Sequence, residues 1–123
     1  MNGIDYLIDT NILVYILQGN PKVHYFAQEE FLAVSCITEI EILGKFQISE
    51  MEKETITELL EQSNIIDITY KIKQIAIKLR QNYHIKLPDA IIAATAIQQN
   101  LTLVTADKGF AKIEELDTIL INI

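Results

Sequence analysis

Acidic residues follow or open apolar runs at four places in this 123-residue sequence. Asp9 comes directly after the run YLI, and Asp107 comes two residues after LTLVT. Glu39 and Glu41 follow FLAVSC, and Asp89 opens the apolar stretch AIIAATAI. Carboxylates that converge repel one another, and a divalent cation relieves that repulsion. A donor set of oxygens, without a neighbouring Cys or a paired His, favours Mg²⁺ or Mn²⁺ over zinc.

Alternating β-type and helical patterns predict the elements that position these acids. We expect strands near residues 6–8, 31–36, 65–68, 101–105 and 118–121, and helices near residues 12–16, 38–48, 49–61, 72–79 and 89–99. Strands that alternate with helices form parallel sheets covered on both faces. The sequence therefore predicts a single α/β domain over residues 1–123, a three-layer α/β/α sandwich around a parallel sheet of four to five strands. Ligands bind such sheets beyond the carboxyl ends of the strands, which is where the acids are expected.

Each acid also has a purely structural interpretation. Asp9 could cap the helix that starts near Asn11, and Asp107 could cap the turn before Phe110. Asp89 could complement the dipole of the helix that it opens. The joint arrangement favours a site, because four separate elements each deliver an acid to the same expected edge.

The charge of the chain is unevenly distributed. The net charge of −7, from 17 acids and 10 Lys or Arg, counts against a nucleic-acid partner if it is spread evenly. Residues 49–67 contain six acids and one lysine, whereas residues 71–86 contain five basic residues and no acid. The basic segment can offer a face to phosphates, or it can be a solvated face that pairs with the acidic segment before it.

Several classes of protein are excluded by composition. The sequence has no run of about 20 apolar residues, so we expect no membrane helix, and its first residues do not resemble a secretory signal. Its single cysteine, Cys36, excludes an internal disulfide. We expect a cytoplasmic protein. His24 and His84 stand in no catalytic motif, and His84 is expected to be a loop or helix-end residue rather than a base.

Four segments resemble the acidic motifs of PIN-domain ribonucleases. They are LIDTN at residues 7–11, SCITEIEILG at 35–44, LPDAIIAATA at 87–96 and LVTADKGF at 103–110. Their order and spacing resemble the VapC-like bacterial branch, and together they cover nearly the whole chain. The resemblance implies a PIN-like fold and metal-assisted hydrolysis of RNA phosphodiesters, in which one or two Mg²⁺ or Mn²⁺ ions activate a water.

The resemblance also implies roles for individual residues. It makes the catalytic and metal-binding acids Asp9, Glu41, Asp89 and Asp107, with Asn11 and Thr105 as supporting polar neighbours. The second motif selects Glu41, which follows Thr38 by three positions. Helical periodicity instead places Glu39 in the apolar arc with Ile40 and Phe46, as the more enclosed acid. Glu39 therefore stays an alternative.

The implied substrate is single-stranded or structured RNA. Among the basic side chains, Lys86, Lys108 and Arg80 are the candidates for backbone contacts, and Lys86 lies three residues before Asp89. The resemblance further implies a toxin that pairs with an antitoxin protein and forms a homodimer. The helix expected at 49–61 and the one before it could clamp a partner helix.

The sequence also leaves two other functions open. A signalling receiver domain has a similar length and an acidic Mg²⁺ pocket, but it needs an acceptor Asp at the end of its third strand, and we expect Asp67 inside that strand. A PIN-fold binding domain without activity is the other alternative. The complete set of acids argues against it.

Overall fold

The computed structural model describes residues 5–27 and 32–123. In these residues the strands are β1 (Tyr6–Ile8), β2 (Leu32–Ser35), β3 (Asn64–Ile66), β4 (Thr102–Thr105) and β5 (Thr118–Leu120). The α-helices are α1 (Thr10–Leu17), α2 (Cys36–Leu43), α3 (Glu50–Glu61), α4 (Tyr70–Asn82) and α5 (Leu87–Gln99). Two 3₁₀ segments, η1 (Pro21–Ala27) and η3 (Lys108–Lys112), complete the described elements.

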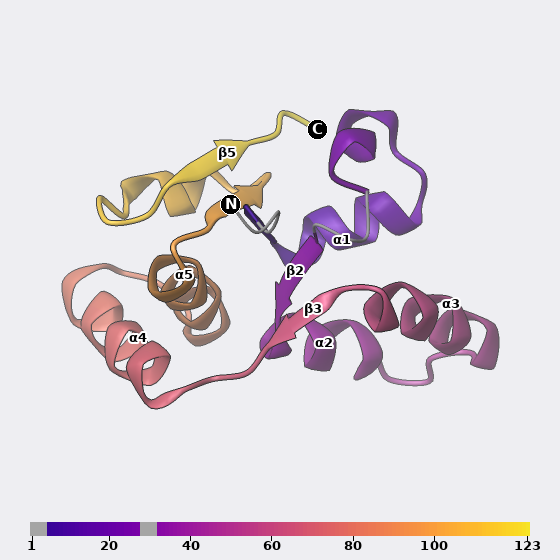
Figure 1. The fold of residues 1–123 in the computed structure, drawn as a ribbon, viewed down its shortest axis with the longest axis horizontal. Helices are drawn as coiled ribbons and strands as arrows, with labels where there is room; N and C mark the ends of the chain where they lie inside the picture. The colour runs from indigo at the N-terminus through magenta and orange to yellow at the C-terminus, as the bar shows by residue number, and fades with distance from the viewer. Residues whose placement is uncertain (1–4, 28–31) are drawn as a thin grey trace.

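The strands form one parallel sheet in the order β3-β2-β1-β4-β5. Successive residues of a strand point to opposite faces, and β1 shows this directly. Leu7 belongs to a hydrophobic cluster with α4, α5 and η3, whereas Ile8 belongs to a second cluster with α1, α2, α3 and η1. The three layers are visible in Figure 1, and the expected α/β/α sandwich is confirmed.

The strand order places a reversal at the centre of the sheet. The chain runs outward from β1 through β2 to β3, and then returns to place β4 on the other side of β1. Crevices for ligands form at such a reversal, beyond the carboxyl ends of the strands. Asp9 follows β1 and Asp107 follows β4, so these two acids lie on either side of the reversal.

The same strand order argues against a receiver domain. Receiver-type sheets have the order 2-1-3-4-5, which puts the third strand next to the first. Here β3 is an edge strand, separated from β1 by β2. Our expectation that Asp67 lies inside the third strand was wrong, because β3 ends at Ile66. Asp67 nevertheless follows an edge strand, away from the central reversal.

Several expected boundaries were also wrong. The second helix ends at Leu43 rather than at Ile48, because Gly44 takes the C-cap position and a Cβ there would lie 2.4 Å from the carbonyl oxygen of Ile40. The apolar arc expected for this helix was also wrong. Ile40 is 63% exposed, and Phe46, which lies beyond the end of the helix, is 86% exposed. The start of the second strand at Phe31 lies outside the described residues.

The acidic and basic segments do not pair with each other. Helix α3 begins with the predicted capping box of Ser49 and Glu52, and it lies at the opposite end of the long axis from α4 (Figure 1). Within residues 5–27 and 32–123, the ion pair found is that between Lys45 and Glu52, at 2.8 Å. The alternative in which the two segments pair with each other was therefore wrong. None of the helices in the described part of the chain has the length and apolarity to span a membrane.

Candidate active site

Asp9 is held in place by hydrogen bonds to both of its carboxylate oxygens. It is the N-cap of α1, and its Oδ1 accepts from the backbone N–H of Thr10 at 2.8 Å. The hydroxyl of Thr105, at the end of β4, donates to Oδ2 at 2.7 Å. The side chain is 6% exposed. Asp9 thus both caps a helix, as the structural interpretation predicted, and presents a buried carboxylate at the sheet reversal.

Asp107 is tied to the same threonine and to the turn after it. Its backbone N–H donates to the Thr105 hydroxyl at 3.0 Å, and its Oδ1 accepts from the Gly109 N–H at 2.8 Å. A Cβ at Gly109 would lie 3.1 Å from that oxygen. Glycine therefore allows the backbone to approach the Asp107 carboxylate closely. The Asp107 side chain itself is exposed.

Asp89 stands in the first turn of α5. This helix is buried from Ala90 to Ala96, as its apolar sequence predicts. The burial of α5 holds Asp89 half-buried at the same edge of the sheet as Asp107, and both side chains line one cavity.

Helix α2 places Glu41 at the site. The hydroxyl of Thr10 donates to its Oε1 at 2.7 Å and lies 2.9 Å from the hydroxyl of Thr38. Because Thr10 gives its proton to Glu41, Thr38 donates to Thr10. The sequence analysis gave no role to Thr10 or Thr38, although Thr10 lies in the segment 7–11 and Thr38 in the segment 35–44 that resemble the acidic motifs. Glu41 is exposed, and Glu39 on the same helix is half-buried.

The acids act on one another electrostatically. Burial raises the pKa of Asp9, the bonds from Thr105 and Thr10 lower it, and the charges of Asp107 and Glu41 raise it further. Burial likewise raises the pKa of Asp89, as do the charges of Asp9, Asp107 and Glu41, while Lys86 lowers it. The charge of Glu41 thus acts on both carboxylates. The structure brings together Asp9, Glu41, Asp89 and Asp107.

This set of side chains fits a hard divalent cation. The donors are carboxylate oxygens, as Mg²⁺ and Mn²⁺ prefer, and their mutual repulsion is what a cation would relieve. Across the described residues, no three Asp, Glu, His or Cys side chains are already arranged to enclose an ion. Two of the acids, Glu41 and Asp107, are exposed side chains that accept hydrogen bonds from Thr10 and Gly109.

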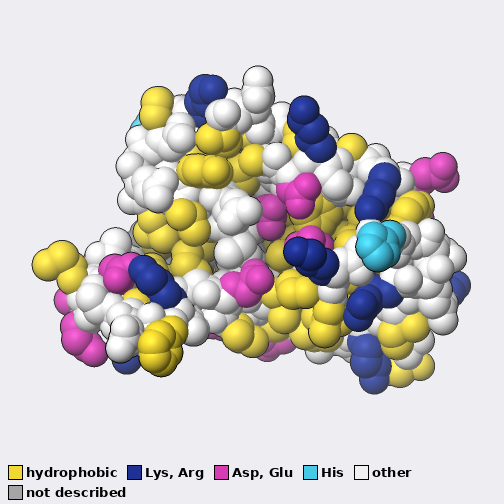
Figure 2. All heavy atoms as spheres, turned by 180° about the vertical axis from the view of Figure 1, so that it is seen from behind, with side chains coloured by type: hydrophobic (Ala, Val, Ile, Leu, Met, Phe, Trp, Pro, Cys, Tyr) yellow, Lys and Arg dark blue, Asp and Glu magenta, His cyan; other side chains and the backbone are white. Residues whose placement is uncertain are grey.

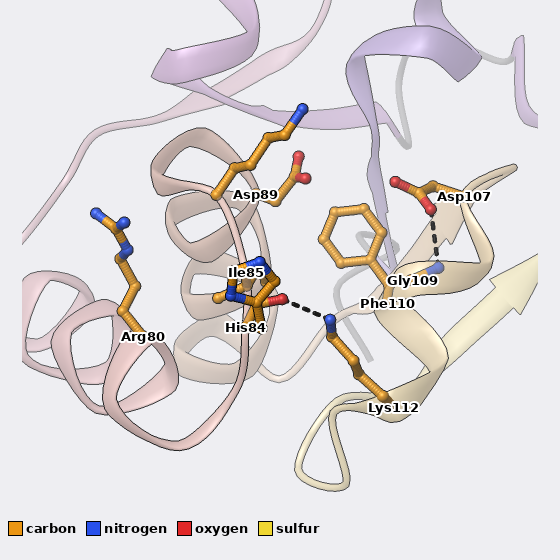
Figure 3. A pocket seen from close by; sticks show the side chains of 9 residues that line it. Arg80, His84, Ile85, Asp89, Asp107, Gly109, Phe110 and Lys112 are labelled. Carbon is orange, nitrogen blue, oxygen red and sulfur yellow. Dashed lines mark hydrogen bonds between the residues drawn. The ribbon is translucent and has the colours of Figure 1, made fainter.

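Two of the remaining candidates, Arg80 and Lys86, line a cavity beside the acids. It has a volume of about 360 Å³, and Arg80, Lys86 and Asp89 are among its lining residues (Figure 3). Lys108, at the start of η3, and Asn11, on α1, are exposed and do not line it. Figure 2 shows carboxylates gathered in a hollow of the surface, with cationic side chains and an imidazole next to them.

The chain is similar to known proteins along nearly its whole length. The PIN domain family model matches residues 6–116. Ribonuclease VapC2 from Rickettsia felis is 30% identical over 125 residues, covering 90% of this chain and 93% of that protein. A toxin–antitoxin complex from Klebsiella pneumoniae contains a chain 33% identical, with a TM-score of 0.80 over 94% of this chain and 96% of that one. VapBC2 from Rickettsia felis, bound to a promoter DNA fragment, gives 28% identity and a TM-score of 0.83 over 97% and 100%.

Proposed function

Because this chain belongs to the PIN domain family, we propose that it is a metal-dependent endoribonuclease that hydrolyses phosphodiester bonds of single-stranded or structured RNA. The observation that carries the proposal is the cluster of Asp9, Glu41, Asp89 and Asp107 at the sheet reversal, where burial and like charges raise the pKa of two carboxylates. Its relative from Rickettsia felis is a ribonuclease, which supports the same reaction here.

The four acids would hold one or two Mg²⁺ or Mn²⁺ ions. Such ions supply a water of lowered pKa and neutralise the charge that develops on the phosphate. Asp9 is fixed by Thr105 and Thr10, so it provides a rigid anchor. Asp89 has a raised pKa and, among the described residues, no hydrogen bond to its carboxylate. It is therefore the carboxylate best placed to accept a proton from the attacking water.

A cleavage assay tests this function. Labelled single-stranded RNA is incubated with Mg²⁺ or Mn²⁺, and Asp9→Asn, Asp89→Asn and Glu41→Gln are compared with the wild type. Each variant should lose activity by about 100-fold or more, because a catalytic ion contributes several kcal/mol to stabilising the transition state. Glu39→Gln, on the same helix, is the matched control and should cleave within about threefold of the wild type.

Three results would contradict the proposal. They are cleavage that persists in EDTA, cleavage that is unchanged in Asp9→Asn and Asp89→Asn, and RNA that is bound but never cut. The last result would indicate a PIN-fold binding domain without activity. Loss of activity in Glu39→Gln but not in Glu41→Gln would reassign the second acid.

We further infer that the chain is the toxin of a toxin–antitoxin pair, as the Klebsiella pneumoniae and Rickettsia felis complexes suggest. An apolar groove of about 510 Å³ between α1, α2 and α3, lined in part by Leu17, Ile42 and Met51, offers a surface for a partner helix. Growth arrest on expression of the wild type, but not of Asp89→Asn, would support the toxin role. The expected homodimer is tested by sedimentation velocity of the purified chain.

A further inference from the structure

We propose that the cavity beside the acids is a phosphate-binding subsite, which holds the RNA nucleotide next to the cleaved bond through Arg80, His84 and Lys112. This inference rests on the proposed nuclease function and adds to it a place for the substrate backbone. It also gives a role to His84, for which the sequence predicted none. The side chains that line the cavity come from α4, from the α4–α5 connection, from the start of α5 and from η3.

The cavity has two ends of opposite charge. Asp89 and Asp107 lie at one end, on either side of the Phe110 ring, and His84 lies between Arg80 and Lys112 at the other (Figure 3). Lys86 belongs to the acid end, since its charge acts on Asp89. A cleft of about 360 Å³ falls in the range that holds small molecules of nucleotide size.

Hydrogen bonds hold the backbone at the basic end of the cavity in place. Lys112 Nζ donates to the backbone carbonyl of His84. One residue earlier, the hydroxyl of Tyr83 donates to Glu115 Oε1 at 2.7 Å and accepts from the Glu114 N–H at 3.2 Å. These bonds join the α4–α5 connection to the segment that follows η3. The bonds therefore hold His84 and Lys112 next to each other at this end of the cavity.

Arg80 and His84 keep their side-chain donors available for a ligand. Within the part of the chain that the structure describes, neither Arg80 nor His84 forms an ion pair or a side-chain hydrogen bond. An arginine presents a planar fork of N–H groups that matches two phosphate oxygens, and an imidazole adds a further donor. Ile85, which is half-buried, also lines the cavity and offers apolar contact to the sugar or base of the same nucleotide.

Charge favours a polynucleotide over an acidic peptide as the occupant. In the proposed reaction the cleaved phosphate sits at the acid end, where divalent cations neutralise it. A polynucleotide carries a second phosphate one nucleotide away, and that phosphate meets the basic end. An acidic peptide would use only the basic end of the cavity, and the neighbouring acids would repel it. RNA would use both ends, so the presence of both in one cavity favours RNA.

Fluorescence anisotropy of a labelled single-stranded RNA, measured in EDTA, tests the subsite without cleavage. A gel confirms that the RNA stays intact. We expect Arg80→Gln and His84→Gln to weaken binding about three- to tenfold each, and Arg80→Gln to reduce the salt slope by about 0.7, the value for one phosphate contact on a single strand. Both side chains are exposed, and thermal unfolding curves verify that the variants fold.

Lys78→Gln is the matched control. It removes the same charge from α4 as Arg80→Gln, but Lys78 lies two residues earlier, about 200° round the helix, and does not line the cavity. It should bind RNA within about twofold of the wild type.

The proposal is overturned if Arg80→Gln and His84→Gln bind RNA as tightly as Lys78→Gln does. It is also overturned if both variants keep RNA binding but lose affinity for a labelled peptide of alternating Asp and Glu, which would assign the cavity to a protein partner. Failure of the nuclease function is a separate result. It would show as RNA that is bound through the cavity but not cut when Mg²⁺ or Mn²⁺ is added.

Discussion

Asp9 serves the fold and the site with the same carboxylate. One oxygen caps α1 through the Thr10 N–H, and the other accepts from Thr105 across the sheet. Its burial makes the ionised form unfavourable, and these two bonds partly compensate. A residue with both duties is restrained before any ligand arrives, which is the property that a metal-binding anchor needs.

The raised pKa of Asp89 predicts a stability gain when its charge is removed. A carboxylate with a raised folded pKa binds its proton more tightly in the folded state, so its stabilising effect is complete below about pH 4 and is lost as the pH rises through the folded pKa. At pH 7 in EDTA, Asp89→Asn should therefore unfold at a higher temperature than the wild type. Because water screens this half-exposed group, we expect about 2 °C.

Calorimetry in EDTA at pH 7 and at pH 3.5 checks this prediction. The difference should become much smaller at pH 3.5, where most of the wild-type carboxylate is protonated in both states. Asp67→Asn, at an exposed acid beside the edge strand β3, is the control. A lower unfolding temperature for Asp89→Asn at pH 7 would show that its charge stabilises the fold through the α5 dipole instead.

The sequence predicts strand-end acids better than it predicts their neighbours. Asp9 and Asp107 could be placed at one edge because each follows an apolar run in an alternating α/β pattern, and their roles stay a proposal. Thr10 and Thr38 could not be assigned, because their contact joins residues 28 positions apart. His84 could not be assigned either, since its surroundings come from α4 and η3, which only the folded chain brings together.

Among the elements, α2 shows why periodicity failed. Apolar residues at Ile40, Leu43 and Phe46 continue a helical pattern past Gly44. The helix nevertheless ends at Leu43, because Gly44 at the C-cap packs its backbone against the Ile40 carbonyl. Ile40, within the helix, and Phe46, beyond its end, are both exposed. The predicted arc therefore contained two residues that are not in the core.

The turn at the start of η3 holds the Asp107 carboxylate in position through Gly109. A substitution at Gly109 tests whether that position matters. In Gly109→Ala the new Cβ would lie 3.1 Å from Asp107 Oδ1, so the carboxylate must shift by a few tenths of an ångström. We expect RNA cleavage to fall about three- to tenfold, because small displacements of catalytic groups reduce rates. The metal concentration for half-maximal activity should rise as well, as metal titrations of the cleavage rate would measure.

Ala111→Ser, at an exposed position in the same 3₁₀ segment, is the control for Gly109→Ala. It should leave both quantities unchanged. Wild-type cleavage and metal dependence in Gly109→Ala would mean that Asp107 needs no exact position in the reaction.

At the scale of the whole molecule, charge is separated along the long axis. The acidic α3 and the basic α4 lie at opposite ends (Figure 1), although they are neighbours in the sequence. A count of charges along the chain could not show this, because β3 lies between the two helices and each of them packs against a different hydrophobic cluster. The net charge of −7 therefore does not describe the surface that a substrate meets.

This separation predicts that the acids of α3 have little effect on RNA. Replacing Glu50, Glu54 and Glu58 with Gln removes three negative charges, all on exposed side chains. At 0.15 M salt, charges further apart than about 8 Å are largely screened, so kcat/KM for RNA should stay within about twofold of the wild type. Initial cleavage rates at low RNA concentration measure this. A tenfold increase would show that overall charge, rather than local charge, controls binding.

The opposite placement of α3 and α4 also gives the molecule an electric dipole along its long axis, which acts over a distance at low ionic strength, where the screening length is about 30 Å at 0.01 M salt. In the field of an approaching polyanion, such a dipole experiences a torque that turns the α4 end forward and the α3 end away. Collisions are thus oriented before contact, and the face that carries the acids and the adjoining cavity turns toward the strand. A chain with a repulsive net charge can in this way still meet RNA in a productive orientation.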